Sequence, residues 1–172
     1  MNLPNKLTVA RVAMVPVFVY LYLKDQTMAA LIVFLAASFT DYLDGYLARK
    51  HDLITNFGKI MDPLADKVLV YAAFSCMVEN GTVPSWMLIV ILAREFTVAG
   101  MRTVAASEGL VIAAGMTGKI KTVLQMIAVP LLILDRPEWI AAAGQLFLWA
   151  SVVMTVVSGA EYIWQNRNVF NS

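Results

Sequence analysis

The chain has 172 residues, of which 60% are hydrophobic and 15% charged, and its mean hydropathy is +0.71. This composition excludes an ordinary water-soluble domain, in which about 25% of residues are charged. The formal net charge of +1 gives no basis for a nucleic-acid partner held by bulk electrostatics, and a single cysteine, Cys76, excludes an intramolecular disulfide and a cysteine metal cluster.

Six apolar stretches follow one another along the chain, and a helix needs about 20 such residues to cross a bilayer. They span residues 7–23, 28–48, 60–78, 85–106, 120–134 and 139–164. The fifth is short and contains Pro130, which predicts a kink or a helix that begins before residue 120. We therefore expect an all-α integral membrane protein with six transmembrane helices in one domain over residues 1–172.

Basic residues are concentrated on one side of this six-helix arrangement. Of the 13 Lys and Arg, only Lys24 and Arg136 fall on the side away from the termini. Cytoplasmic segments of membrane proteins carry the excess of Lys and Arg, so both termini and the segments 49–59 and 107–119 are expected in the cytoplasm. The sequence thus predicts a multi-pass protein of the cytoplasmic (inner) membrane, with short connections on the opposite side.

Four aspartates lie near the cytoplasmic ends of the second and third stretches. Asp41 and Asp44 are three residues apart, and Asp62 and Asp66 are four residues apart. Each spacing places a pair on one helical face, about one turn apart, and the loop between the two helices brings both pairs to one depth. Pro63 is compatible with Asp62 as the cap of a helix or with a helix that begins earlier.

Four ionised carboxylates in a partly dehydrated pocket repel one another unless cations neutralise them. All-oxygen ligands suit hard divalent ions, Mg²⁺ or Mn²⁺, and two such ions can clamp a phosphoryl group. Between the acids, Gly45, Ala48 and Gly58 leave room for a nucleotide or pyrophosphate, and Arg49 offers a forked donor. The segment therefore predicts phosphoryl transfer.

Residues 41–66 form one pattern, D-x2-D-G-x2-A-R-x8-G-x3-D-x3-D, with every fixed position present. This pattern resembles the signature of the CDP-alcohol phosphotransferases. Residues 2–11, 61–68, 93–102 and 118–122 are similar to the phosphatidylglycerophosphate synthases within that family, so the resemblance covers the N-terminal two thirds of the chain. It implies a fold of six transmembrane helices, two divalent metal ions, a homodimer, and a reaction in which an alcohol displaces CMP from a CDP-linked lipid or alcohol.

For this subfamily, the resemblance implies transfer of the phosphatidyl group from CDP-diacylglycerol to glycerol 3-phosphate in phospholipid biosynthesis. CDP-diacylglycerol would enter from the cytoplasmic leaflet, with its pyrophosphate at the ions held by the four aspartates. Asp66 would be the base that takes the proton from the acceptor hydroxyl. The resemblance also places Asn5 and Thr8 near the nucleotide.

Glycerol 3-phosphate is a small dianion, so its site needs cations near the metals. The candidates are Arg94, Arg102, Lys119 and Lys121. Arg94 and Arg102 are about 80° apart around a helix and share a broad face. Lys119 and Lys121 are about 200° apart, so only one points inward if both are helical, and we expect this to be Lys119. Glu95 is expected to pair with a neighbouring basic residue.

Other interpretations stay open. In the simplest interpretation, the aspartates form ordinary interfacial salt bridges with Arg49, Lys59 and Lys67. The basic residues at cytoplasmic helix ends would then only satisfy the rule that cytoplasmic segments are basic, without binding a ligand. The same chemistry with phosphatidylglycerol, inositol phosphate or serine as acceptor is a second. A small cation transporter is a third, because carboxylates in helix bundles also bind ions, although these acids lie at the cytoplasmic ends and no second cluster continues a path.

Overall fold

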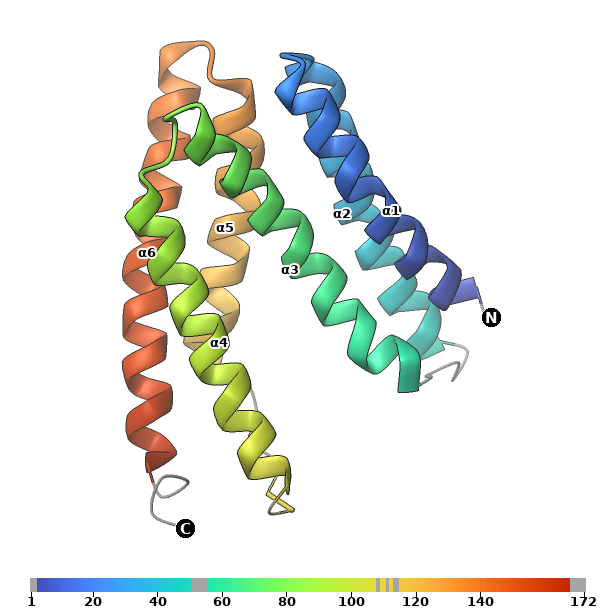
Figure 1. Ribbon diagram of the computed structural model, residues 1–172, viewed down its shortest axis with the longest axis vertical. Coiled ribbons are helices and arrows are strands. Elements are labelled where there is room, and N and C mark those ends of the chain that lie inside the picture. The colour runs from blue at the N-terminus through green and yellow to red at the C-terminus, as the bar shows by residue number, and fades with distance from the viewer. Residues whose placement is uncertain (1–2, 51–55, 108, 111, 113–114, 168–172) are drawn as a thin grey trace.

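Within the residues that it describes, the computed structural model folds into six α-helices that alternate in direction (Figure 1). Their bounds are α1 Leu3–Leu23, α2 Thr27–Lys50, α3 Asn56–Glu79, α4 Ser85–Ser107, α5 Met116–Leu134 and α6 Glu138–Gln165. The structure describes residues 3–50, 56–107, 109–110, 112 and 115–167, but not the side chains of 3–6, 41–50, 56–60, 62, 63 and 66. The expected all-helical fold is confirmed, with a helix over each apolar stretch.

α3 and α5 begin earlier in the chain than the apolar stretches that predicted them. α3 begins at Asn56, so residue 62 lies inside the helix and the earlier of the two starts is observed. α5 begins at Met116 and thereby adds a turn before residue 120, as its short apolar stretch required. Among the described residues, two helices are long and apolar enough to cross a membrane, α5 and α6. Shorter apolar helical segments lie at Leu7–Leu23 and Thr27–Thr40.

The helices reverse direction through short connections at the end of the bundle away from the two termini (Figure 1). These connections are residues 24–26, 80–84 and 135–137, so the short connections expected on this side are confirmed. In the second of them, Gly81 has φ +79°, a conformation that glycine adopts without strain from a Cβ atom. Gln145 Nε2 also donates to the Thr82 carbonyl at 2.9 Å, which fastens this connection to α6.

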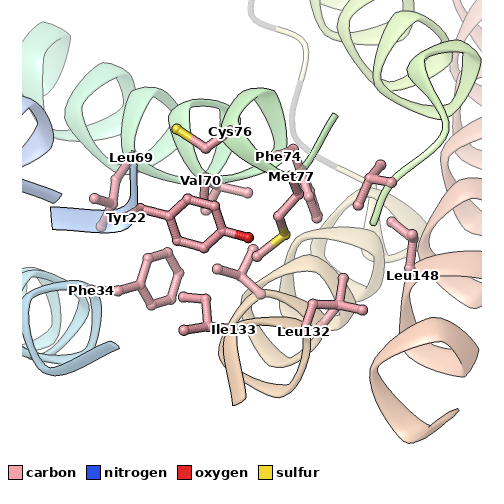
Figure 2. Packing of buried hydrophobic residues seen from close by; sticks show 14 of the residues in the cluster. Tyr22, Phe34, Leu69, Val70, Phe74, Cys76, Met77, Leu132, Ile133 and Leu148 are labelled. Carbon is pink, nitrogen blue, oxygen red and sulfur yellow. The ribbon is translucent and has the colours of Figure 1, made fainter. Parts of the chain in front are cut away.

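A hydrophobic core fills the bundle near these short connections (Figure 2). It draws Tyr22 from α1, Phe34 from α2, Phe74 from α3, Leu132 from α5 and Leu148 from α6. The Tyr22 hydroxyl accepts a hydrogen bond of 2.8 Å from the amide nitrogen of Asn80. Cys76 is buried in the same cluster, where its thiol packs among apolar side chains.

α5 and α6 approach each other closely at Gly144. A Cβ atom there would lie 3.0 Å from Leu132 Cδ2 and 3.1 Å from the Leu132 backbone nitrogen. The backbone nitrogen of a helix cannot yield as a flexible side chain can, so a larger residue at 144 would push the two helices apart. Gly144 thus sets how closely α6 approaches α5.

We expect Gly144→Ala to lower the free energy of unfolding by about 1 kcal/mol, because overpacking costs about 1–3 kcal/mol and alanine recovers up to about 1 kcal/mol of helix propensity. Gly100→Ala is the matched control, because Gly100 is also helical and a Cβ atom there meets nothing within 4 Å. Thermal unfolding of the two variants in detergent checks this. A Gly144→Ala midpoint at or above that of Gly100→Ala would contradict the packing.

Candidate active site

The predicted metal ligands lie on two helices that contact each other, α2 and α3. Asp41 and Asp44 fall in the last ten residues of α2, and Asp62 and Asp66 in the first half of α3. The helical backbone at both places agrees with the predicted spacing of about one turn within each pair. The structure describes the backbone of these aspartates but not their side chains, and the same holds at the positions predicted to surround the nucleotide: Asn5, Gly45, Ala48, Arg49 and Gly58.

Two polar side chains of α1 are buried near the aspartate-bearing end of α2. Thr8 and Arg11 are both buried, and Arg11 Nε donates a hydrogen bond of 3.3 Å to the carbonyl oxygen of Ala37 on α2. Ala37 precedes Asp41 by about one helical turn. Arg11 therefore fastens α1 to the part of α2 that leads into the aspartates. From the sequence it was expected only as one of the basic residues of the cytoplasmic side, and its position inside an apolar stretch is the signal that could have revealed this contact.

A cavity of about 350 Å³ lies between α3, α4 and α5. Its charged lining consists of five basic side chains and one carboxylate: Lys67, Arg94, Arg102, Lys119, Lys121 and Glu95. Gly115, Gly118, Thr122 and Val123 complete the lining. The structure thus brings together all four basic residues that were predicted to bind the acceptor, in a space with a clear excess of positive charge.

Glu95 lies at the centre of this cluster. Its Oε2 atom lies 2.8 Å from Lys67 Nζ on α3, and its Oε1 atom lies 2.9 Å from the Nη1 atom of Arg94 on α4. Oε1 also accepts a hydrogen bond from Lys121 Nζ on α5. The pairing expected for Glu95 is therefore confirmed, with three partners from three helices. We define these four residues as the Glu95 cluster.

The orientation predicted for the two lysines of α5 is wrong. Lys121 is buried and bonded to Glu95, whereas Lys119 is exposed. Only one of the two lysines points inward, as their angle around the helix predicted, but the carboxylate of Glu95 selects Lys121. A buried ammonium is stabilised by a buried partner, and Glu95 of α4 faces Lys121. Both lysines still line the cavity.

The Arg94 side chain is confined by two glycines of neighbouring helices. A Cβ atom at Gly118 of α5 would lie 3.1 Å from Arg94 Nη2, and one at Gly159 of α6 would lie 3.0 Å from Arg94 Cγ. Arg94 Nε is buried and has no hydrogen-bond partner among the described residues. The glycines thus leave a slot for an arginine that reaches from α4 to the cavity.

Arg102 is held by α6. Its Nε atom donates to the Tyr162 hydroxyl at 3.2 Å, and its Cζ atom lies 5.5 Å from the centre of the Tyr162 ring. Such a cation–π contact contributes about 0.5–1 kcal/mol at exposed sites and more when it is desolvated. Arg94 and Arg102 both line the cavity, in agreement with the shared helical face that the sequence predicted.

Comparison with known proteins identifies the family to which these residues belong. The model of the CDP-alcohol phosphatidyltransferase family matches residues 1–157. The chain belongs to this family. The resemblance deduced from the aspartate motif is therefore confirmed, and because the family is one of transferases, the cation-transporter alternative is not supported.

Several relatives within this family match nearly the whole chain. The CDP-diacylglycerol--glycerol-3-phosphate 3-phosphatidyltransferase of Bacillus subtilis is 46% identical over 183 residues, covering 96% of this chain and 95% of the relative. The protein of the same name from Rickettsia typhi is 37% identical, covering 98% of this chain and 99% of the relative. A probable phosphatidylglycerophosphate synthase of Mycobacterium tuberculosis is 36% identical, covering 94% of this chain and 80% of the relative. Membership of this family fits a membrane protein.

Lys67 is the cavity residue that sequence reasoning placed elsewhere. In the simplest alternative it was a partner of the aspartates, yet the structure pairs it with Glu95. Its position directly after Asp66 turns it by about 100° around α3, away from the face of Asp62 and Asp66. This angle between Lys67 and Asp66 indicates that Lys67 has a partner other than the aspartates. It does not indicate that this partner is Glu95, which lies on another helix.

We expect Lys121→Met to lower the stability of the protein more than Lys119→Met. Each variant removes one positive charge from α5, but only Lys121 is buried against Glu95, and a hydrogen bond to a charged group contributes about 1.5–3 kcal/mol. Thermal unfolding midpoints of the two variants in the same detergent measure the difference. Equal midpoints would contradict the buried position of Lys121.

Proposed function

We propose that the chain transfers the phosphatidyl group of CDP-diacylglycerol to the hydroxyl of glycerol 3-phosphate, giving phosphatidylglycerophosphate and CMP. Family membership and the names of relatives that match almost the whole chain support this proposal. The observation that carries it is the cavity of about 350 Å³ with five basic side chains against one carboxylate. A small phosphorylated acceptor suits that volume and charge.

The charge of the cavity also bears on the alternative acceptors. Serine carries no net negative charge at neutral pH, so it would leave the excess of basic side chains uncompensated. Inositol phosphate shares the phosphate group with glycerol 3-phosphate and is larger. Phosphatidylglycerol is itself a lipid, whose diacyl part a small charged cavity does not suit. Glycerol 3-phosphate therefore agrees best with both charge and size.

The donor chemistry of the aspartate motif fits two divalent cations, Mg²⁺ or Mn²⁺. Asp41 and Asp44 on α2 and Asp62 and Asp66 on α3 would hold them, because the helical backbone sets each pair about one turn apart on two helices in contact. Such ions would supply positive charge that neutralises the pyrophosphate and stabilises the attacking and leaving oxygens.

The protein's own side chains divide the remaining work. Arg94, Arg102, Lys119 and Lys121 bind the acceptor phosphate, and Asp66 accepts the proton of the acceptor hydroxyl. That oxygen forms a bond to the β-phosphorus while the bond from this phosphorus to CMP breaks. Arg49 donates to the nucleotide, for which Gly45, Ala48 and Gly58 leave room, and Asn5 and Thr8 lie near it.

The proposed setting is the cytoplasmic (inner) membrane, with all six helices as spans and both termini and the active site in the cytoplasm. The asymmetry of basic residues supports this orientation. α1 begins and α6 ends on the side of the bundle away from the short connections (Figure 1), which agrees with both termini on one side of the membrane. Exposed tryptophans near helix ends, Trp86, Trp139 and Trp164, suit the two membrane interfaces. We also propose that the protein is a homodimer, as the family resemblance implies.

The proposal predicts that the purified protein, given CDP-diacylglycerol and Mg²⁺, incorporates glycerol 3-phosphate into lipid with release of CMP. A panel of glycerol 3-phosphate, inositol phosphate, serine and phosphatidylglycerol, scored by lipid product, measures the choice of acceptor. A chelator abolishes the reaction and Mg²⁺ or Mn²⁺ restores it. Product from serine or inositol phosphate alone would overturn the proposed acceptor.

We expect Asp66→Asn to lower kcat by about 100-fold or more at saturating Mg²⁺, because a general base contributes about 10²–10⁴-fold. Asp25→Asn is the control, since Asp25 is exposed at the opposite end of the bundle and its variant should keep full activity. Initial rates with CDP-diacylglycerol and glycerol 3-phosphate measure both. Full activity of Asp66→Asn with metal bound would rule out Asp66 as the base.

A further inference from the structure

The Glu95 cluster connects the two halves of the proposed site. Lys67 directly follows Asp66 on α3, the helix that carries half of the proposed metal ligands. From there its Nζ atom reaches the carboxylate of Glu95 on α4. The same carboxylate holds Arg94 of α4 and Lys121 of α5, which line the basic cavity. One side chain thus ties the aspartate-bearing helix α3 to α4 and α5, the other two helices that line the cavity.

Burial makes this link stronger than a surface ion pair. The Glu95 side chain is 7% exposed and that of Lys121 is 3% exposed, whereas that of Lys67 is 43% exposed. A charged side chain at the centre of a membrane helix costs about 2.5–3.5 kcal/mol on insertion scales, so it persists where partners compensate it. Glu95 has three such partners, and it in turn reduces the repulsion among them.

The cations of the cluster keep donors that Glu95 does not use. A lysine ammonium has three N–H donors and an arginine guanidinium has five, and each of the three cations makes one contact with Glu95. Since all three line the cavity, the remaining donors are available to an anion there. Lys67 thereby joins the four basic residues already proposed for the acceptor.

We propose that Glu95 is the positioning residue of the acceptor site. Glu95 does not touch the phosphate. It holds Lys67, Arg94 and Lys121 at positions from which their remaining donors bind the phosphate of glycerol 3-phosphate, and through Lys67 it fixes these positions relative to the aspartates of α3. This inference rests on the proposed function. It assigns a role to a carboxylate that would otherwise only weaken an anion site by repulsion.

Loss of Glu95 should affect the three cations unequally. Arg94 stays confined by Gly118 and Gly159, which limit where its side chain can go. Lys67 and Lys121 have flexible stems and would turn away from each other once the carboxylate is gone. The acceptor site would therefore lose part of its arrangement. Binding of glycerol 3-phosphate should become weaker, whereas binding of CDP-diacylglycerol should change little.

The test is a comparison of steady-state kinetics for Glu95→Gln, Glu95→Asp and Lys67→Met. Glu95→Gln should raise KM for glycerol 3-phosphate about tenfold or more, as expected when charge-assisted contacts are lost. Its KM for CDP-diacylglycerol should stay within about twofold of the parent value. Glu95→Asp retains the charge and should recover part of the acceptor KM. Glu79→Gln, an exposed change at the far end of α3, is the control.

Lys67→Met carries the same test if Glu95→Gln does not fold, because Lys67 is partly exposed and its loss leaves Glu95 with two cations. It should also raise KM for glycerol 3-phosphate and spare KM for CDP-diacylglycerol. Unchanged acceptor KM values in these variants would overturn the inference alone. So would a parallel rise of both KM values with a lower unfolding midpoint, which would show a merely structural role. A parent protein that does not use glycerol 3-phosphate would contradict the proposed function as well.

Discussion

Three helices each bring a cation to the carboxylate of Glu95, and this contact organises the polar half of the bundle. Without it, Lys121 would be a buried ammonium with no counter-ion among the side chains that the structure describes, and the basic side chains of the cavity would repel one another. The carboxylate lowers that repulsion without cancelling the positive charge of the cavity. The cavity therefore keeps its excess of positive charge while the carboxylate holds three of its basic side chains in place.

The bundle separates this polar part from an apolar core. The core lies near the short connections away from the termini, where Tyr22, Phe74 and Leu132 pack together (Figure 2). The close contact of α5 with α6 at Gly144 belongs to this end. Toward the other end, the helices bury polar side chains, among them Arg11 on α1 and Lys121 on α5. Packing at one end therefore supplies the framework on which charged residues are held at the other.

The sequence predicted the helices well because hydropathy and length determine them, and it predicted the family because the aspartate motif has fixed residues at fixed spacing. It also placed Arg94 and Arg102 on one broad helical face, since an eight-residue separation on one helix fixes their relative direction, and both line the cavity. It failed for Lys119 and Lys121, because helical geometry says that one points inward but not which one. That choice depends on Glu95, which lies 26 positions from Lys121 in the chain. Lys67 was missed for the same reason, because its partner is on another helix.

The central claim is that the cavity recognises the phosphate of the acceptor. The most direct measurement is the ratio of kcat/KM for glycerol 3-phosphate to kcat/KM for glycerol, which has the same hydroxyl and no phosphate. A site whose cations are arranged for a phosphate should reject glycerol by about 1,000-fold or more, because its charged groups would be left unpaired. A ratio near one would show that the basic cavity plays no part in choosing the acceptor and would contradict the account.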